Sequence, residues 1–400
     1  MQSVSDSALQ RTVRQPAESG AKIRFAGIDI VKITALFLVV TVHAFLNTGF
    51  YGTPISFTFG AVQMYFRWAA FCCVPLFMTV TGYLMSRKTL SGKYYAGVLR
   101  VLVIYVVISL ICVLFNIKYN DFTYTLWHVI RGLFMFTDAQ YSWYVEYYLC
   151  MFLLIPFLNQ AYHGMKTRRN KRFMLMTVCL LFLFAQSFFI GTNPDSQIKI
   201  FPSYFTRGYP IAYYLIGAYI RDFPPKLTLR NKLKFLVTYL LALVWVSLVT
   251  FYQCLKNTDN NCVWRSWHND DYASWPVALM TVSLFLLLFD IRIRSRLCSA
   301  ILAKLSNATF AGYLISYIFD CIYYKKLNND YQTVPERFLH VPLIVLKVFA
   351  LSIFSGLVIQ GGYDLIAGRI RAGREKKRRI QSKNPPQIKH SAASHPSQEP

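Results

Sequence analysis

The sequence predicts an all-helical integral membrane protein, a bundle of about ten transmembrane helices with both termini in the cytoplasm. Three observations lead to this prediction. The 400 residues are 55% hydrophobic and only 15% charged, which is too apolar for a soluble domain with a hydrated surface. Apolar stretches of about 18 to 25 residues recur, each long enough to cross a hydrocarbon core of about 30 Å. Finally, the positive charges gather in alternate loops.

Each apolar span is expected to be a helix, because backbone exposed to lipid must satisfy its own hydrogen bonds. The first span follows a polar stretch with four basic residues and lacks a small-residue cleavage site, so we expect it to be retained. The spans fall near residues 28–47, 61–85, 98–116, 141–160, 173–190, 205–220, 233–253, 273–290, 306–324 and 341–366.

The distribution of basic residues predicts the orientation. The chain has 43 Lys and Arg residues against 18 Asp and Glu, a formal charge of +25. Of these basic residues, 31 fall in or beside the N-terminal segment, the even-numbered loops and the C-terminal tail, against 9 in or beside the odd-numbered loops. The positive-inside rule then places both termini in the cytoplasm. Because the charges form short runs between spans and no single basic face, nucleic acid is excluded as a partner.

The chain divides into three regions by composition. Residues 1–24 form a polar cytoplasmic segment, residues 25–368 the transmembrane domain, and residues 369–400 a basic tail that is expected to be disordered. A long outer loop around 124–134 has apolar residues at helical spacing and predicts an interfacial helix. Cys254 and Cys262 share a polar loop, and the sequence leaves open whether they form a disulfide.

Asp29, Lys32 and His43 lie on one face of the first span. At about 100° per residue, the step from Lys32 to His43 is three turns plus about 20°. Asp29 is close enough in sequence to pair with Lys32, while His43 lies about 16 Å farther along the axis, in the outer part of the bilayer. We interpret this stripe as functional. The alternative is an interfacial ion pair with a hydrogen-bonded helix-packing histidine.

Other intramembrane charges are predicted to share the depth of His43. Charges at this depth are costly unless they pair or line a wet cavity. A carboxylate hydrogen-bonded to the imidazole would fix its tautomer and let His43 act as a general base, but the sequence does not decide between Glu146 and Asp320. The cations can instead extend to the outer headgroups. The set comprises Arg67, Glu146, Arg207, Asp320 and Lys347.

The polar loop that follows the seventh span carries Trp264 and Trp267. Their rings can stack on a sugar, or they can belong to the aromatic belt that many membrane proteins place at the membrane interface.

Five ordered sequence blocks together resemble the bacterial membrane-bound acyltransferase 3 family, many members of which O-acetylate cell-surface glycans. In the first block, a basic residue precedes a functional histidine by eleven positions, as Lys32 precedes His43 here. Two departures are that Lys32 stands where the family most often has Arg, and Thr81 where it usually has Ser. The blocks comprise residues 27–32 with 38–43, 74–84, 142–158, 209–217 and 312–316.

The resemblance implies a multi-pass protein of the bacterial inner membrane that takes acetyl-CoA, or another short acyl-CoA, from the cytoplasm. The acyl group would pass to a hydroxyl of a cell-surface glycan or lipid-linked saccharide at the outer face. No metal is expected. The paired arginines often found in the first cytoplasmic loop occur only loosely, and the basic residues expected to bind the CoA phosphates at the inner mouth are Lys32, Arg87, Lys88, Lys93 and Arg100. The positive-inside rule alone also accounts for a basic residue at each of these positions.

Within this reading, His43 either activates the acceptor hydroxyl or carries the acyl group, with Glu146 or Asp320 as its acid partner. Arg67 or Arg207 would stabilise the oxyanion. Trp264 and Trp267 are the expected sugar contacts. Two other functional classes remain open: a proton-coupled carrier or exporter, because the bundle holds an intramembrane histidine, acids and cations, and a non-catalytic scaffold of glycan assembly.

Overall fold

The computed structural model describes residues 26–55, 57–184, 201–256, 261–265 and 271–383, and all regular structure in them is helical. Short 3-10 helices are η2 (Phe50–Gly52), η4 (Ser203–Gly208) and η6 (Asp271–Ala273). The α-helices are α1 (Ala26–Asn47), α2 (Phe57–Ala70), α3 (Cys73–Met85), α4 (Gly92–Ala96), α5 (Val98–Tyr119), α6 (Leu126–Met135), α7 (Trp143–Gly164), α8 (Arg168–Leu183), α9 (Tyr209–Asp222), α10 (Leu229–Lys256), α11 (Trp275–Leu288), α12 (Arg296–Asp330) and α13 (Val334–Lys383).

The predicted all-helical architecture is confirmed, and every predicted apolar span coincides with at least one helix. Within the described residues, 5 helical segments are long and apolar enough to cross a membrane: 26–47, 59–85, 92–119, 229–256 and 334–373. Helices such as α9 and α11, with 14 residues each, are shorter than a straight crossing requires. The total of ten crossings and the orientation of the termini stay predictions.

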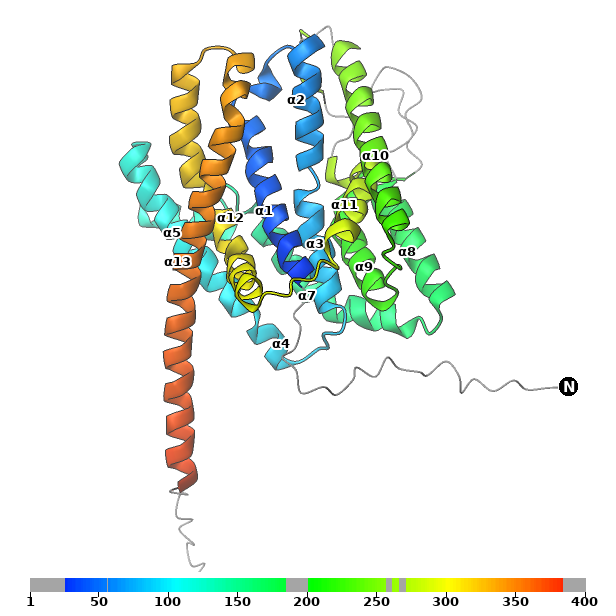
Figure 1. The fold of residues 1–400 in the computed structure, drawn as a ribbon. Helices are drawn as coiled ribbons and strands as arrows, with labels where there is room; N and C mark the ends of the chain where they lie inside the picture. Colours follow the sequence, from blue (N-terminus) through cyan, green and yellow to red (C-terminus); the bar gives the residue numbers. More distant parts are fainter. Residues whose placement is uncertain (1–25, 56, 185–200, 257–260, 266–270, 384–400) are drawn as a thin grey trace, which may run out of the picture.

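Helix α1 lies in the centre of the bundle (Figure 1). It packs against α2, α3, α11, α12 and α13, and α12 in turn packs along α13. On the other side of α1, α3 packs against α9, and α10 packs against α11 and α2. This central position explains why most of α1 is buried, and it places the stripe of Lys32 and His43 inside the protein.

The second predicted span is broken in the middle. Helix α2 ends at Ala70 and α3 begins at Cys73, with a turn at Phe71 and Cys72. Pro75 accounts for the break, because it has no amide hydrogen to donate to the carbonyl of Phe71 and so cannot continue the α-helical ladder.

Helices α3 and α9 approach closely through glycine. A Cβ on Gly217 would lie 2.8 Å from the amide nitrogen of Tyr83, and one on Gly82 would lie 2.7 Å from the carbonyl carbon of Tyr214. Both obstacles are backbone atoms, which cannot move aside as a flexible side chain can. The two glycines therefore allow the backbones of α3 and α9 to touch.

We expect Gly217→Val to destabilise the bundle by at least about 1–3 kcal/mol, because the side chain overpacks this contact. The measurement is the temperature at which the purified protein loses its monodisperse size-exclusion peak. Gly362→Val is the matched control, since a Cβ at Gly362 meets no atom within 4 Å. An equal loss in both variants would show that the α3–α9 contact is not the cause.

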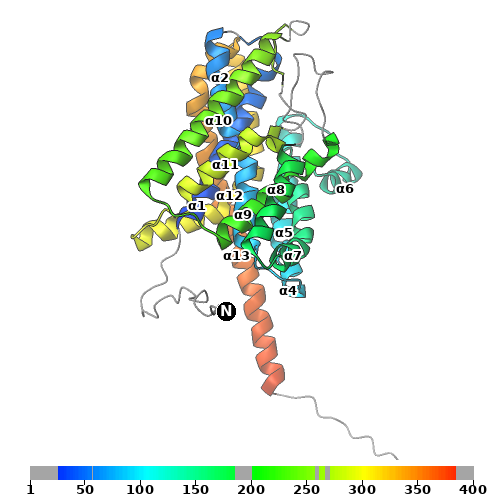
Figure 2. The same ribbon diagram turned by 90° about the vertical axis from the view of Figure 1, so that its right-hand side faces the viewer.

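Two further predictions concern segments that leave the bundle. The helix expected around 124–134 is present as α6, which stands off the side of the bundle (Figure 2) and begins with a capping box between Thr125 and His128. Its interfacial position stays a prediction. The tail predicted to be disordered from residue 369 does not begin there, because α13 continues to Lys383. Its Ala, Arg, Glu, Lys and Gln residues are strong helix formers, which explains the continuation.

Candidate active site

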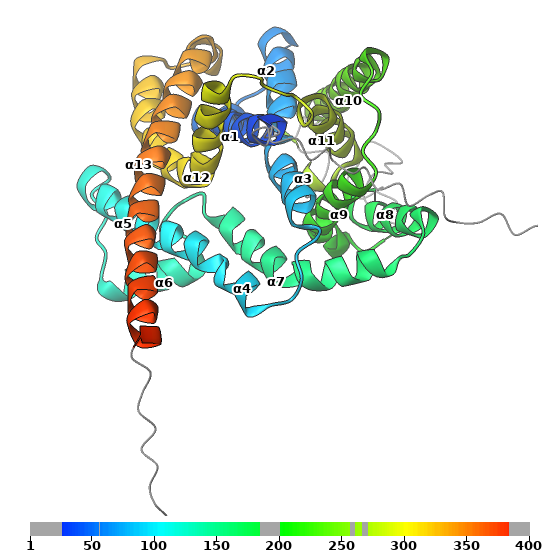
Figure 3. The same ribbon diagram turned by 60° about the horizontal axis from the view of Figure 1, so that its bottom comes forward.

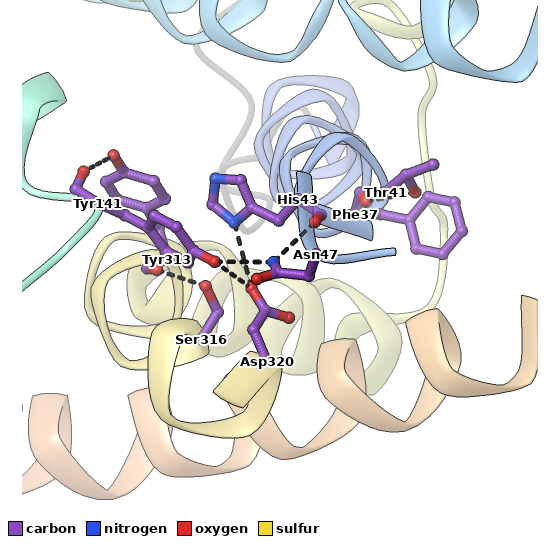
Figure 4. Close-up of polar contacts among 8 residues, drawn as sticks. All are labelled: Phe37, Thr41, His43, Asn47, Tyr141, Tyr313, Ser316 and Asp320. Atoms are coloured by element: carbon purple, nitrogen blue, oxygen red, sulfur yellow. Dashed lines mark hydrogen bonds and ion pairs between the residues drawn. The ribbon is translucent and has the colours of Figure 1, made fainter. Parts of the chain in front are cut away.

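His43 and Asp320 form a buried pair at the centre of the bundle, a pair called here the dyad. His43 lies on α1 and Asp320 on α12, and their side chains are 7% and 0% exposed. The Nδ1 atom of His43 is 3.4 Å from Oδ2 of Asp320. The other imidazole nitrogen, Nε2, points away from Asp320 (Figure 4). This geometry suits a carboxylate that orients a histidine and stabilises its protonated form.

Tyr141 contacts both residues of the dyad. Its hydroxyl donates to Oδ2 of Asp320 at 2.8 Å, the same oxygen that faces His43. Its ring stacks on the imidazole with the centroids 3.6 Å apart and the planes at 29°. Asn47, one turn after His43, donates to the hydroxyl of Tyr141 at 3.2 Å and to the carbonyl of His43 at 2.8 Å. The imidazole is therefore held by its stacking on Tyr141 and by its ion-pair contact with Asp320, while the hydrogen bonds fix Tyr141 and Asp320 around it (Figure 4).

The loop that carries Tyr141 joins α6 to α7 and is tightly bonded. The hydroxyl of Ser142 donates to the carbonyls of Phe136 and Ala139, each at 2.6 Å. The hydroxyl of Tyr313, on α12, donates to the carbonyl of Tyr141. In the same loop, Asp138 is 4% exposed, and burial raises the pKa of its carboxyl to about 6. The hydrogen bonds of Ser142 and Tyr313 position Tyr141 against the dyad.

A cavity of about 330 Å³, called here the central cavity, lies between α1, α3, α5, α7, α12 and α13. Figure 3 shows how these helices are arranged in the bundle. Lys32 and Arg100 line it, together with Thr81 and a mostly apolar wall. Its volume is at the lower end of the range of about 300–1,000 Å³ that small-molecule sites occupy.

The central cavity has an open end and a closed end. Near Lys32 its lining residues include Leu84, Gly97, Arg100 and Asn307, all of them exposed. At the opposite end its lining residues include Val39, Tyr144 and Tyr313, all of them buried. Val39 precedes His43 by one turn, about 6 Å along α1. The cavity therefore runs from a basic mouth to a point just short of the dyad.

The other basic residues predicted to bind CoA phosphates do not line the central cavity. Arg87, Lys88 and Lys93 are exposed near the mouth side of α3 and α4. Arg87 lies 3.8 Å from Asp222, whose other carboxylate oxygen accepts a bond from Lys171 at 2.7 Å. Of the five predicted cations, the structure brings Lys32 and Arg100 together around the cavity.

Arg67 is held in an aromatic cluster and does not reach the protein surface. It is 3% exposed, and its guanidinium carbon lies 3.8 Å from the ring centroid of Phe71 and 4.3 Å from those of Trp68 and Trp264. Its Nε donates to the hydroxyl of Tyr51 at 3.2 Å. Cation–π contacts therefore stabilise this buried charge and use one face of Trp264. The oxyanion role of Arg67 stays a prediction.

The remaining predicted site residues lie elsewhere. Glu146, Arg207 and Lys347 are exposed, so the carboxylate beside His43 is that of Asp320. Trp267 lies outside the described residues. Cys254 and Cys262 are both free thiols; Cys254 accepts a hydrogen bond from the backbone amide of Arg265 at 3.3 Å.

Sequence reasoning missed the residues that surround the dyad, namely Tyr141, Asn47 and Tyr313. A signal existed for two of them. Asn47 follows His43 by four positions and so shares its helix face, and Tyr313 belongs to one of the five blocks that carry the family resemblance. Tyr141 lies in a loop, where no periodicity indicates the direction of a side chain.

Comparison with known protein families agrees with this geometry. The profile described as an acyltransferase domain, of the acyltransferase 3 family, matches residues 25–360. No curated protein and no solved structure gives a significant match. The matched range contains α1 with His43, all the residues that line the central cavity, and Asp320. The chain therefore belongs to the acyltransferase 3 family of membrane acyltransferases.

Proposed function

We propose that the protein transfers an acetyl or similarly short acyl group from cytoplasmic acyl-CoA to a hydroxyl of a cell-surface glycan or lipid-linked saccharide at the outer face. One observation carries this proposal. A cavity with two cations at its mouth ends one turn short of a buried His–Asp pair. No separate receiving domain is required by this arrangement, because the pair itself can activate an acceptor.

The central cavity suits the donor. Lys32 and Arg100 supply positive charge near its open end, where the phosphates of CoA would bind by charge-assisted hydrogen bonds. The walls beyond them are largely apolar, including Val39, Val74 and Phe77, and match an uncharged pantetheine arm with its thioester. A thioester that enters acyl group first would present its carbonyl at the closed end.

The dyad supplies the proton transfer. Nε2 of His43 takes the proton of the acceptor hydroxyl as the oxygen attacks the thioester carbonyl, and Asp320 stabilises the imidazolium. A C–O bond forms, the C–S bond breaks, and the departing thiolate takes the proton back from His43. The products are an O-acyl saccharide and free CoA.

The acceptor side follows from the direction of α1. Positive-inside topology puts the Lys32 end of this helix at the cytoplasm, so His43 lies in the outer half of the membrane. A saccharide at the outer interface would approach the dyad from the side opposite the cavity mouth. Trp264 packs against Arg67, and its contact with a sugar ring stays a prediction.

The test begins with donor binding, measured by calorimetry on the protein in nanodiscs. We expect the wild type to bind acetyl-CoA and Lys32→Ala to bind it about 10–100-fold more weakly, since a bond to a charged group contributes about 1.5–3 kcal/mol. Added salt should reduce the difference. Lys234→Ala is the control, because Lys234 is exposed on α10, which does not line the cavity.

A second readout separates the functional classes. Release of free CoA that depends on an added glycan acceptor supports the transferase. Movement of an unmodified solute into vesicles, driven by a proton gradient and without acyl-CoA binding, would instead establish a carrier. If the protein shows neither activity and does not bind acetyl-CoA, the proposal is overturned, and a non-catalytic scaffold of glycan assembly is the remaining functional class.

A further inference from the structure

Two tyrosine rings form the closed end of the central cavity. Tyr144, on α7, and Tyr313, on α12, both line it and are 7% and 5% exposed. The two rings meet edge to face, with centroids 5.8 Å apart and planes at 83°. Phe77, on the facing helix α3, packs against Tyr144 at 5.9 Å. Together these rings close the apolar end of the cavity.

The tyrosines lie between the cavity and the dyad. The centroid of Tyr313 is 6.5 Å from that of the His43 imidazole, and His43 itself is not part of the cavity lining. Along α12, Tyr313 precedes Asp320 by seven positions, about 10 Å. Any group that enters from the mouth therefore meets Tyr144 and Tyr313 before it comes within reach of His43.

From this arrangement we infer that Tyr144 and Tyr313 limit the length of the acyl group, with Tyr144 as the specificity-determining residue. The inference rests on the proposed function. The acyl group is the leading end of an acyl-CoA that enters from the mouth, so the tyrosine rings stop its last carbon. Each added methylene then moves the thioester carbonyl back toward the mouth and away from the dyad.

Tyr313 has a second structural role that Tyr144 lacks. The hydroxyl of Tyr313 donates to the carbonyl of Tyr141, so its loss also disturbs the loop that orients the dyad. Tyr144 contributes its ring to the cavity wall, and its ring contacts in the described structure are with Phe77, Trp143 and Tyr313, not with His43. Shortening Tyr144 is therefore the cleaner way to extend the cavity.

The consequence is a strong preference for short acyl groups. A misplacement of about 1 Å in the reacting groups can cost about 100-fold in rate, and one methylene that does not fit an apolar pocket costs about 10–200-fold. We expect the wild type to use acetyl-CoA at least about 100-fold more efficiently than hexanoyl-CoA, compared by kcat/KM. In Tyr144→Ala that ratio should fall by at least about tenfold.

The experiment measures CoA release from acetyl-, butyryl- and hexanoyl-CoA with one glycan acceptor. The control is Phe310→Ala, which removes a ring from the cavity wall about one turn nearer the mouth than Tyr313 and should leave the acyl-length ratio unchanged. Tyr144→Leu, a smaller change, is run in parallel in case Tyr144→Ala fails to fold, and size-exclusion chromatography reports folding for each variant.

The outcomes separate this inference from the function on which it rests. A wild type that transfers hexanoyl as well as acetyl groups overturns the inference and leaves the transferase intact. The same holds if the folded Tyr144 variants keep the wild-type ratio, or if Phe310→Ala changes it equally. A wild type that binds and transfers no acyl group removes the proposed function, and the inference with it.

Discussion

Replacing His43 with glutamine is expected to lower acyl transfer by about 10²–10⁴-fold while acetyl-CoA binding is kept, because a positioned general base contributes about that factor. Glutamine keeps much of the length and polarity of the side chain but cannot take the proton of the acceptor hydroxyl. The cavity proposed to bind the donor ends before His43 and should be undisturbed. Single-turnover CoA release and calorimetry on the same preparation measure the two effects.

The matched control is His340→Gln. His340 also lies in a helix and packs against an aromatic ring, that of Tyr331 at 4.2 Å, but it belongs to the start of α13 and lines no part of the cavity. It should retain transfer. Full activity in purified His43→Gln would remove His43 from the chemistry, whereas loss of donor binding in that variant would assign it a structural or binding role.

Asp320→Asn is expected to lower kcat by about 10³–10⁴-fold with little change in the KM for the acyl donor. Where a carboxylate orients a catalytic histidine, conversion to the amide favours the wrong tautomer and costs about 10⁴-fold. Asp320 is fully buried, and its Oδ2 faces Nδ1 of His43. The asparagine amide can keep the shape of the site while it removes the charge that stabilises imidazolium.

Tyr141→Phe distinguishes charge from packing in the same experiment. This variant removes the hydroxyl that donates to Oδ2 of Asp320 at 2.8 Å but keeps the ring that stacks on His43. A smaller loss than in Asp320→Asn is expected, since an ordinary hydrogen bond contributes about 0.5–1.5 kcal/mol. If Asp320→Asn is as active as the wild type, the dyad does not act as a His–carboxylate base.

The features predicted best are those that repeat along the chain. Apolar length identified the helices, and the eleven-residue step from Lys32 to His43 placed both residues on one face of α1, where the structure has one lining the cavity and the other in the dyad. The family resemblance drawn from five short blocks is confirmed by the match over residues 25–360. In each case, the deciding information is local in sequence.

The sequence could not predict which side chains surround His43 and Arg67, because those contacts join segments that are far apart in the chain. Depth alone grouped Glu146 with Asp320, yet Asp320 is buried beside His43 and Glu146 is exposed, because a span's rotation about its own axis depends on its neighbours. The same reason applies to Arg67. Its depth suggested contact with headgroups or substrate, but four aromatic side chains from η2, α2, the turn after α2 and the loop after α10 enclose it.

The sequence by itself determined that this chain is an all-helical membrane protein of the acyltransferase 3 family, with Lys32 and His43 on one face of its first helix. Apolar length and helical periodicity suffice for that, since both act within single helices. Only the tertiary structure decided which carboxylate meets His43, that Tyr141 holds the pair, and that Tyr144 and Tyr313 close the cavity below it. Those contacts join α1, α7, α12 and the loop after α6, and side-chain packing between helices sets them.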